Sequence, residues 1–374
     1  MRDFSYVKRI VVKVGTNLLT GEDGNIDTSR IEEIASELAT LKDNDYQVLL
    51  VSSGAVSMGA KEIGHKTKVV HLPLRQACAS IGQPLLMSEY RTAFLRHNLI
   101  CSQILLTRQE FNNRGAYNNL RSSVSTLLAM GIIPIFNEND VVSTAELKTA
   151  FGDNDRMGAL VASKIDADLL ILLTDIDGLY TGNPKTDKEA KFITDIEKVT
   201  KKELNFAKGA GSLFSTGGMR TKLLAADIAS KAHCGTIIAS GYDKDVIVRI
   251  AKGEEIGTFI HPCKKLTQKE RWILNNTHTG SIFVDDGAKE ALLNHKSLLP
   301  KGILKVEGLF ESGEVVQILD QNGVTFAKAV PYYNSTDISL LIGHESQDIS
   351  KLIKDAHKDC IFRPEDMVVV DESL

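Results

Sequence analysis

The sequence has no long hydrophobic run. Its apolar stretches fall well short of the roughly 20 residues that a membrane-spanning helix needs. Its first residues read MRDFSYVKRI, without the apolar core or the cleavage site of a signal peptide. These absences exclude a helical membrane protein and argue against export. We expect the chain to stay in the cytoplasm.

Cysteines are few and scattered. The five of them, Cys78, Cys101, Cys234, Cys263 and Cys360, form no CxxC pair and no cluster with histidine. This spacing excludes a zinc ribbon and a disulfide framework, and it offers no set of side chains that could be assigned to a metal ion. We expect reduced, mostly structural cysteines.

Internal repeats and low-complexity segments are absent as well. The 374 residues are 43% hydrophobic and 25% charged, which suits a large domain followed by a small one. Residues 1–270 carry 34 Lys and Arg against 32 Asp and Glu, whereas residues 271–374 carry 10 against 16. The C-terminal part is therefore acidic and lacks the cationic surface on which non-specific nucleic-acid binding depends.

The first 260 residues alternate short β-branched runs with longer amphipathic stretches. Strands are predicted at 9–14, 47–52, 101–106, 132–136, 168–173 and 235–240, and helices at about 73–97, 115–130 and 218–233. Another helix is predicted to begin at a capping box formed by Ser29 and Glu32. Near-continuous apolar strands favour an α/β three-layer sandwich with a mainly parallel sheet, whose ligands lie beyond the carboxyl ends of the strands.

The pattern changes after Pro262. A charged stretch at 264–272 reads as a connector, and short strands with close turn signals follow it. We predict a first domain at 1–262, a linker at 263–270 and a compact β-rich domain with two helices at 271–374.

Two strands end in residues that suit an anion. Lys13 interrupts the first strand and Gly15 follows it, so that a lysine ammonium and an open backbone could meet a phosphate. An edge-strand lysine that points to solvent is the alternative. The second strand runs through Ser53 into a helix, whose first amides can bind an anion or simply form a turn.

Two polar clusters follow later strands. Residues 137–140 read NEND and residues 152–155 read GDND. The first can bind both an ammonium and a carboxylate, as an amino-acid substrate requires, and the second places Asp155 where it could order catalytic lysines. Asx-rich turns and helix caps are the structural alternatives.

Two further segments suit a nucleotide. Thr174 and Asp175 end the fifth strand, and a turn at 180–184 could form a wall for a base. Residues 215–222 read STGGMRTK, in which glycine amides and Lys222 could surround phosphates, although the segment is not a P-loop NTPase motif. A flexible glycine loop is the alternative.

Taken in order, the segments VVKVGT, SSGA, NENDVV, GDND, LLTDIDGLY and TGGMRTK resemble the successive motifs of the amino acid kinase family. NEND and GDND point within that family to the glutamate 5-kinases. The segment KSLLPKGIL at 296–304 is similar to part of the PUA domain that many bacterial members carry. The segment between NEND and GDND is about one residue longer than the family pattern, and Arg220 stands where a small residue is common.

The resemblance implies roles for individual residues. ATP, with Mg²⁺, would be bound by Lys13, Thr174, Asp175, Thr216, Gly217, Gly218, Met219, Arg220, Thr221 and Lys222. Glutamate would be held by Ser53, Asp140 and Asn154. Lys13 and Lys222 would stabilise the transferring phosphoryl group, and Asp155 would orient both lysines.

The implied reaction makes L-glutamyl 5-phosphate, at the entry to proline synthesis. A glutamate side chain is already ionised at neutral pH, so no general base is needed, and no Ser/His/Asp constellation stands out. The resemblance also implies proline as a feedback inhibitor, a glutamyl phosphate reductase as a partner, and a dimer or tetramer. Acetylglutamate kinase, aspartokinase, UMP kinase, an RNA-binding PUA protein and a catalytically silent homologue remain as alternatives.

Overall fold

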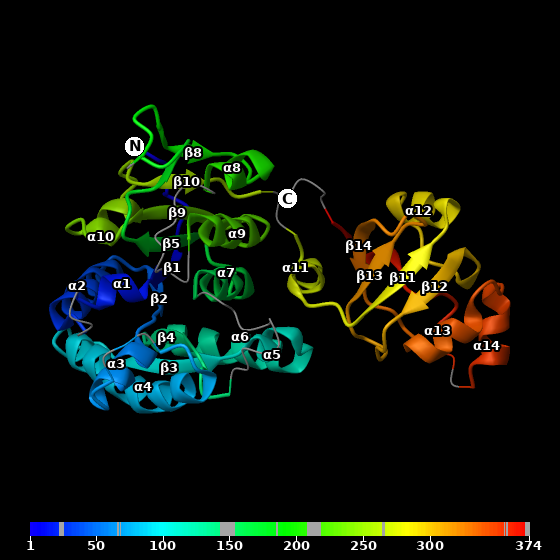
Figure 1. Cartoon of the computed structure of the whole chain (residues 1–374), viewed down its shortest axis with the longest axis horizontal. Coiled ribbons are helices and arrows are strands. Elements are labelled where there is room, and N and C mark those ends of the chain that lie inside the picture. Colours follow the sequence, from blue (N-terminus) through cyan, green and yellow to red (C-terminus); the bar gives the residue numbers. More distant parts are fainter. Residues whose placement is uncertain are drawn as a thin grey trace. The chain divides into compact units, whose positions relative to one another are not determined.

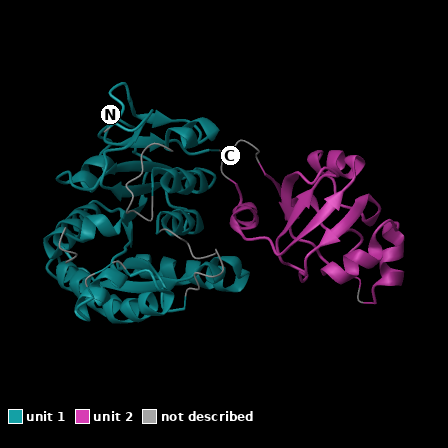
Figure 2. Cartoon of the chain, viewed as in Figure 1, with its two compact units in different colours: residues 1–265 teal, residues 266–374 magenta. Residues whose placement is uncertain are grey.

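The computed structural model describes residues 1–21, 26–65, 67, 69–142, 154–184, 186–207, 218–263, 266–354, 356 and 358–370. The chain divides into two compact units, Met1–Lys265 and Leu266–Leu374 (Figure 2). The division falls inside the segment that the sequence predicts as a linker. Among the described residues, no helix combines the length and the apolar character needed to cross a membrane.

Unit 1 is built on an eight-stranded sheet. Its strands are β1 (Arg9–Val14), β2 (Gln47–Val51), β3 (Cys101–Leu106), β4 (Ile133–Glu138), β5 (Leu169–Thr174), β8 (Asp195–Ile196), β9 (Gly235–Ser240) and β10 (Thr258–Ile260). They lie in the order β3-β4-β2-β1-β5-β9-β10-β8, and every pair is parallel except β9 with β10. The prediction of a mainly parallel sheet is confirmed, with all six predicted strands present and β8 and β10 added.

Helices cover both faces of this sheet. The helices of unit 1 include α1 (Thr16–Leu19), α2 (Thr28–Asp43), α3 (Ala55–Glu62), α4 (Leu72–Leu95), α5 (Arg108–Asn112), α6 (Arg114–Ala129), α7 (Asn154–Lys164), α9 (Met219–Ser230) and α10 (Val246–Ala251). Figure 1 shows α2 and α10 on one side of the central strands and α7 and α9 on the other. Alternate residues of β1 therefore face different layers: Ile10, Val12 and Val14 join the core under α2 and α4, whereas Lys13 lies toward α7.

The start of α2 differs from the sequence prediction. Asp27, not Ser29, is the N-cap, and its side chain accepts a hydrogen bond from the Arg30 amide at 3.1 Å. The Ser29 hydroxyl donates to the Asp27 carboxylate instead. An aspartate at position 27 can accept hydrogen bonds from the first backbone amides of the helix, which have no partner within the helix. The helix therefore begins at Thr28, one residue before the predicted cap Ser29.

Helices α3 and α4 pack backbone against backbone. A Cβ added to Gly82 would lie 1.9 Å from the Ala55 carbonyl oxygen, and one added to Gly59 would lie 1.8 Å from the Cys78 carbonyl oxygen. Only glycine permits such an approach. The contact fixes the start of α3, directly after the Ser53 turn.

Unit 2 contains a separate five-stranded sheet. Its strands are β11 (Gly280–Val284), β12 (Ile303–Glu307), β13 (Val316–Leu319), β14 (Thr325–Ala329) and β15 (Met367–Val369), in the order β12-β11-β13-β14-β15. Its helices are α11 (Gln268–Asn275), α12 (Asp286–Leu293), α13 (Ser335–Leu341) and α14 (Ile349–Leu352). The described part of this unit thus contains four α-helices, more than the two that the sequence predicted.

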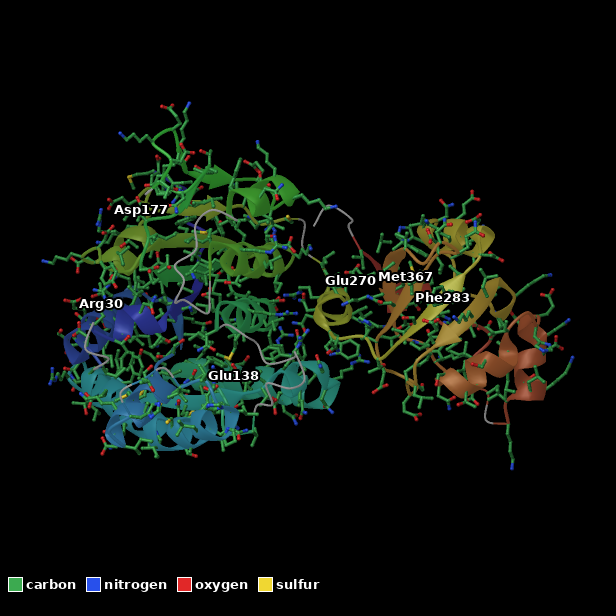
Figure 3. All side chains as sticks on the ribbon, viewed as in Figure 1. Arg30, Glu138, Asp177, Glu270, Phe283 and Met367 are labelled. Carbon is green, nitrogen blue, oxygen red and sulfur yellow. The ribbon has the colours of Figure 1, made fainter. Side chains whose placement is uncertain are left out.

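The charged stretch at 264–272 is also corrected. Thr267 and Glu270 form a capping box, and α11 begins at Gln268, inside the predicted linker. Lys269 forms an ion pair with the buried Asp366. Helix α11, in which Figure 3 labels Glu270, belongs to unit 2.

Candidate active site

Two lysines meet one aspartate at the carboxyl edge of the large sheet. The Lys13 Nζ lies 2.7 Å from Oδ1 of Asp155, and the Lys222 Nζ lies 3.0 Å from Oδ2 of the same carboxylate. All three side chains are buried, with exposed fractions of 5% for Lys13, 7% for Lys222 and 0% for Asp155. The structure thus brings together the three residues that the sequence proposes as catalytic.

The fold explains this convergence. β1 lies between β2 and β5 in the sheet, so the alternative of an edge-strand lysine pointing to solvent is wrong. Asp155 lies in the first turn of α7 and Lys222 in the first turns of α9. Helices α7 and α9 pack against each other, and the contacts of Asp155 with Lys13 and Lys222 bring their first turns together at the end of β1.

The cluster carries a formal charge of +1, since two ammonium groups share one carboxylate. Buried ions are costly unless paired, and here one buried carboxylate pairs with two ammonium groups. Such a site is suited to an incoming anion with several negative oxygens. The Asp155 carboxylate contacts both ammonium groups.

Gly15 keeps space open beside this charge. It precedes α1, and a Cβ added to it would lie 3.5 Å from the Lys13 Nζ. A larger side chain would therefore stand where a phosphate oxygen could approach the ammonium.

Gly54, at the start of α3, has φ of +106°, a conformation that favours glycine.

The residues proposed for the nucleotide lie at the same edge. Thr174 is buried at the end of β5, and its hydroxyl donates to the exposed Asp175 carboxylate at 3.0 Å. Gly218 is the N-cap of α9, and the Thr221 hydroxyl donates to its carbonyl oxygen at 2.7 Å. The remaining members divide by position: Met219 is buried, Arg220 is exposed, and Thr216 and Gly217 lie outside the described residues.

Asn154 organises a polar network next to the cluster. Its Nδ2 donates to the Ser53 hydroxyl at 2.8 Å, to the Ser52 carbonyl at 2.6 Å and to Oδ1 of Asn137 at 3.0 Å. Two of the three predicted glutamate ligands, Ser53 and Asn154, are therefore in direct contact. The network joins the end of β2, the end of β4 and the start of α7.

Two glutamines extend this network and were missed from the sequence. Asn137 donates to Gln83 Oε1 at 2.8 Å, and Gln83 Nε2 donates to Gln103 Oε1 at 3.0 Å. Gln83 lies on the buried side of α4, 54 residues from its partner. A polar residue amid the apolar face of a helix was the available signal.

The third predicted glutamate ligand has a different partner. Asp140 lies two residues beyond β4 and pairs with Arg75 of α4 at 3.0 Å. Glu138, the last residue of β4 and labelled in Figure 3, is buried, and its amide donates to Asn137 Oδ1 at 2.9 Å. Asp153, from the GDND segment, lies outside the described residues.

Desolvation marks two further arginines near this edge. Burial, and to a smaller extent the nearby Arg108 guanidinium, lower the pKa of Arg156, in α7, to about 10. Burial also lowers the pKa of Arg108, at the start of α5. Both remain cationic at neutral pH, so they add positive potential to the first turn of α7. Within the described ranges, no three His, Cys, Asp or Glu side chains cluster as metal ligands.

Comparison with known proteins supplies the family context. The model of the amino acid kinase family matches residues 8–240, and that of the PUA domain matches residues 280–353. The chain is 41% identical over 377 residues to the glutamate 5-kinase of Methanosarcina mazei, covering 99% of this chain and 98% of that one. It is 41% identical over 367 residues to the glutamate 5-kinase of Geobacter sp. strain M21, covering 97% and 98%. Among solved structures, UMP kinase from Bacillus anthracis is similar over 69% of this chain and 98% of that one, with 19% identity and a TM-score of 0.48.

Proposed function

Because the chain belongs to the amino acid kinase family and carries a PUA domain, we propose that it transfers the γ-phosphoryl group of ATP to the side-chain carboxylate of L-glutamate. The product is L-glutamyl 5-phosphate. One observation carries the proposal: Lys13 and Lys222 converge on Asp155 beside the Ser53–Asn154 pair. The glutamate 5-kinases to which the chain is similar over nearly its full length support this choice of substrate.

The nucleophile needs no activation by a base. A glutamate side chain has an ordinary pKa of about 4.3 and is ionised at neutral pH. The obstacle is instead the approach of one anion to another. Catalysis therefore rests on positioning and on positive charge at the phosphoryl oxygens.

Lys13 and Lys222 supply that charge in this scheme. Their ammonium groups are buried away from water, where a charge acts more strongly than it would in water. Asp155 fixes both groups, so little reorganisation is needed as the phosphoryl group transfers. Mg²⁺ bound with ATP adds further positive charge on the phosphates, and its ligands would be mainly phosphate and water, since Asp155 is already engaged by two lysines.

The nucleotide and the acceptor occupy different sides of the lysine pair in this scheme. On the ATP side, we assign Thr174, Asp175 and the segment from Thr216 to Lys222, where the first amides of α9 face the phosphates. On the acceptor side, we assign Ser53, Asn154 and Asp140. The polar Asn154 network would then hold the carboxylate in line with the phosphoryl group.

The acceptor can be identified by trapping the acyl phosphate with hydroxylamine. Purified protein and Mg-ATP are incubated with L-glutamate, N-acetylglutamate, L-aspartate, UMP or no acceptor. We expect hydroxamate from L-glutamate alone. Hydroxamate formed from another acid would identify that acid as the substrate. ADP formed only with UMP would support a nucleoside monophosphate kinase instead.

An acyl phosphate is labile, so we propose that it passes to a glutamyl phosphate reductase. From the similarity to the glutamate 5-kinases, we further propose that L-proline is a feedback inhibitor and that the enzyme is a homo-oligomer in the cytoplasm. Inhibition of hydroxamate formation by L-proline, with D-proline as the control, tests the regulatory part. RNA binding by the acidic unit 2 is not expected to be the main role.

A further inference from the structure

Arg75 forms a specific ion pair at the substrate side of the site. Its Nε and Nη2 both donate to Oδ1 of Asp140, at 3.2 and 3.0 Å. The Asp140 side chain is 11% exposed, whereas that of Arg75 is 45% exposed. A mostly buried carboxylate is thus paired with a guanidinium that reaches solvent.

The position of Arg75 is unfavourable for the helix that carries it. Arg75 is the fourth residue of the 24-residue α4, and the N-cap His71 makes no capping hydrogen bond through its side chain. A cation near a helix N-terminus opposes the helix dipole, at a cost of about 0.3–1 kcal/mol. An ion pair whose arginine is 45% exposed contributes only about 0.2–1 kcal/mol, so the pair adds little net stability to this end of the helix.

Both members of the pair keep unused binding capacity. Arg75 uses two of the five N–H donors of a guanidinium, and both reach the same carboxylate oxygen. Oδ2 of Asp140 has no hydrogen bond within the described part of the chain. A ligand could therefore bind each partner without breaking the pair.

We propose that Asp140 and Arg75 together recognise the α-amino acid head group, and that Arg75 binds its α-carboxylate. This inference rests on the proposed function and extends it to substrate selection. An α-amino acid carries an ammonium next to a carboxylate, and the pair presents the complementary charges, a carboxylate next to a guanidinium. The Asp140 carboxylate takes the ammonium, and the free donors of Arg75 take the carboxylate.

The location of the pair orients the substrate. Asp140 follows Asn137 by three residues, and Asn137 contacts Asn154 in the polar network. The head group would therefore lie at the outer end of β4, and the side chain would extend along the network toward the two lysines. This direction leaves the γ-carboxylate, and not the α-carboxylate, to meet the phosphoryl group.

The inference separates two substrates that differ only at the α-carboxylate. L-Glutamate and its α-amide share the ammonium and the side-chain carboxylate. A charge-assisted hydrogen bond from Arg75 to the α-carboxylate should favour glutamate by about 10- to 100-fold in kcat/KM. Replacing Arg75 should reduce that preference.

The test compares wild type, Arg75→Gln and Arg75→Lys by hydroxamate formation from each substrate. We expect Arg75→Gln to raise the KM for glutamate by about 10- to 100-fold, with kcat within about threefold, and to change the KM for the α-amide little. Arg75→Lys should retain part of the preference, because lysine keeps the positive charge but lacks the planar guanidinium with its paired N–H donors. Arg91→Gln, an exposed arginine on the same helix, is the matched control and should behave as wild type.

The outcomes are distinct. An active Arg75→Gln enzyme whose KM rises equally for both substrates would mean that Arg75 only holds Asp140 in place, and it would overturn the inference alone. Wild-type protein that forms no hydroxamate from L-glutamate would overturn the proposed function and this inference with it. A lost preference for glutamate in Arg75→Gln, partly restored in Arg75→Lys, would support the assignment.

Discussion

Replacing Lys222 by methionine removes one of the two ammonium groups that meet at Asp155. Methionine keeps most of the length and the apolar stem of lysine, so the buried position stays filled. Lys13 and Asp155 remain as a neutral pair at 2.7 Å. The formal charge of the cluster therefore falls from +1 to zero while its shape changes little.

The size of the effect follows from this lost charge. A unit charge about 4 Å from a charged phosphoryl oxygen contributes roughly 4 kcal/mol at an effective dielectric constant of about 20. Part of that interaction also exists in the ground state with bound ATP, so only the remainder affects turnover. We expect kcat to fall by about 10²- to 10³-fold, the range found when one preorganised donor is removed from an active site.

The assay is steady-state hydroxamate formation with L-glutamate and ATP varied in turn. We expect the KM for glutamate to change by less than about threefold, because the charge matters most in the transition state. Lys231→Met is the matched control. This lysine lies at the C-terminal end of α9, and its side chain, which is only partly buried, forms an ion pair with Asp227. Its replacement should leave kcat within about twofold of the wild-type value. A Lys222→Met enzyme with nearly normal kcat, or with a loss confined to the KM for glutamate, would refute the reasoning.

Three other substitutions test the framework. Asp155→Asn removes the carboxylate that two buried ammonium groups share, so it should lower the free energy of unfolding by about 3–5 kcal/mol. Burial raises the pKa of Glu37, whose carboxylate accepts a hydrogen bond from the Ile247 amide, to about 7. The folded state then keeps a proton that the unfolded state loses near the ordinary pKa of about 4.5. The free energy of unfolding should therefore fall by up to about 3 kcal/mol as pH rises from about 4.5 through about 7. Glu37→Gln should flatten this dependence. Gly82→Ala should destabilise unit 1 by about 1–3 kcal/mol, because its Cβ would lie 1.9 Å from the Ala55 carbonyl oxygen.

Urea denaturation, followed by circular dichroism, measures all three. Gly115→Ala is the control for Gly82, because its Cβ would meet a side-chain oxygen of Asn113 at 3.3 Å and no backbone. An unchanged midpoint for Asp155→Asn or Gly82→Ala would show that the contact relaxes at little cost. For Glu37, equal pH slopes in the wild type and in Glu37→Gln would remove that carboxyl as the source of the dependence.

Local sequence pattern was sufficient for the strands. β1, β3 and β9 have the predicted bounds. In β1 and β9 a short β-branched run leaves little choice of structure. The same reasoning located Lys13, since a lysine within an apolar strand needs a partner. The identity of that partner was not local: Asp155 and Lys222 lie 67 residues apart and meet only when α7 and α9 pack together.

Residues whose partners lie far along the chain were missed. Gln83 and Arg75 lie on α4, far along the chain from Asn137 and Asp140, and nothing in the helical pattern names those partners. The start of α11 was missed for a different reason. Its capping box at Thr267 was present in the sequence, but the surrounding charges were interpreted as a connector.

The most direct test of the mechanism follows oxygen from the acceptor to the phosphate. L-Glutamate labelled with ¹⁸O in its side-chain carboxylate is incubated with the enzyme, Mg-ATP and hydroxylamine, and the released phosphate is examined by ³¹P NMR. If the γ-carboxylate attacks phosphorus, hydroxylamine then displaces phosphate from the acyl carbon, and each phosphate carries one ¹⁸O from glutamate. Phosphate without the label, released at the rate of ATP consumption, would contradict the account.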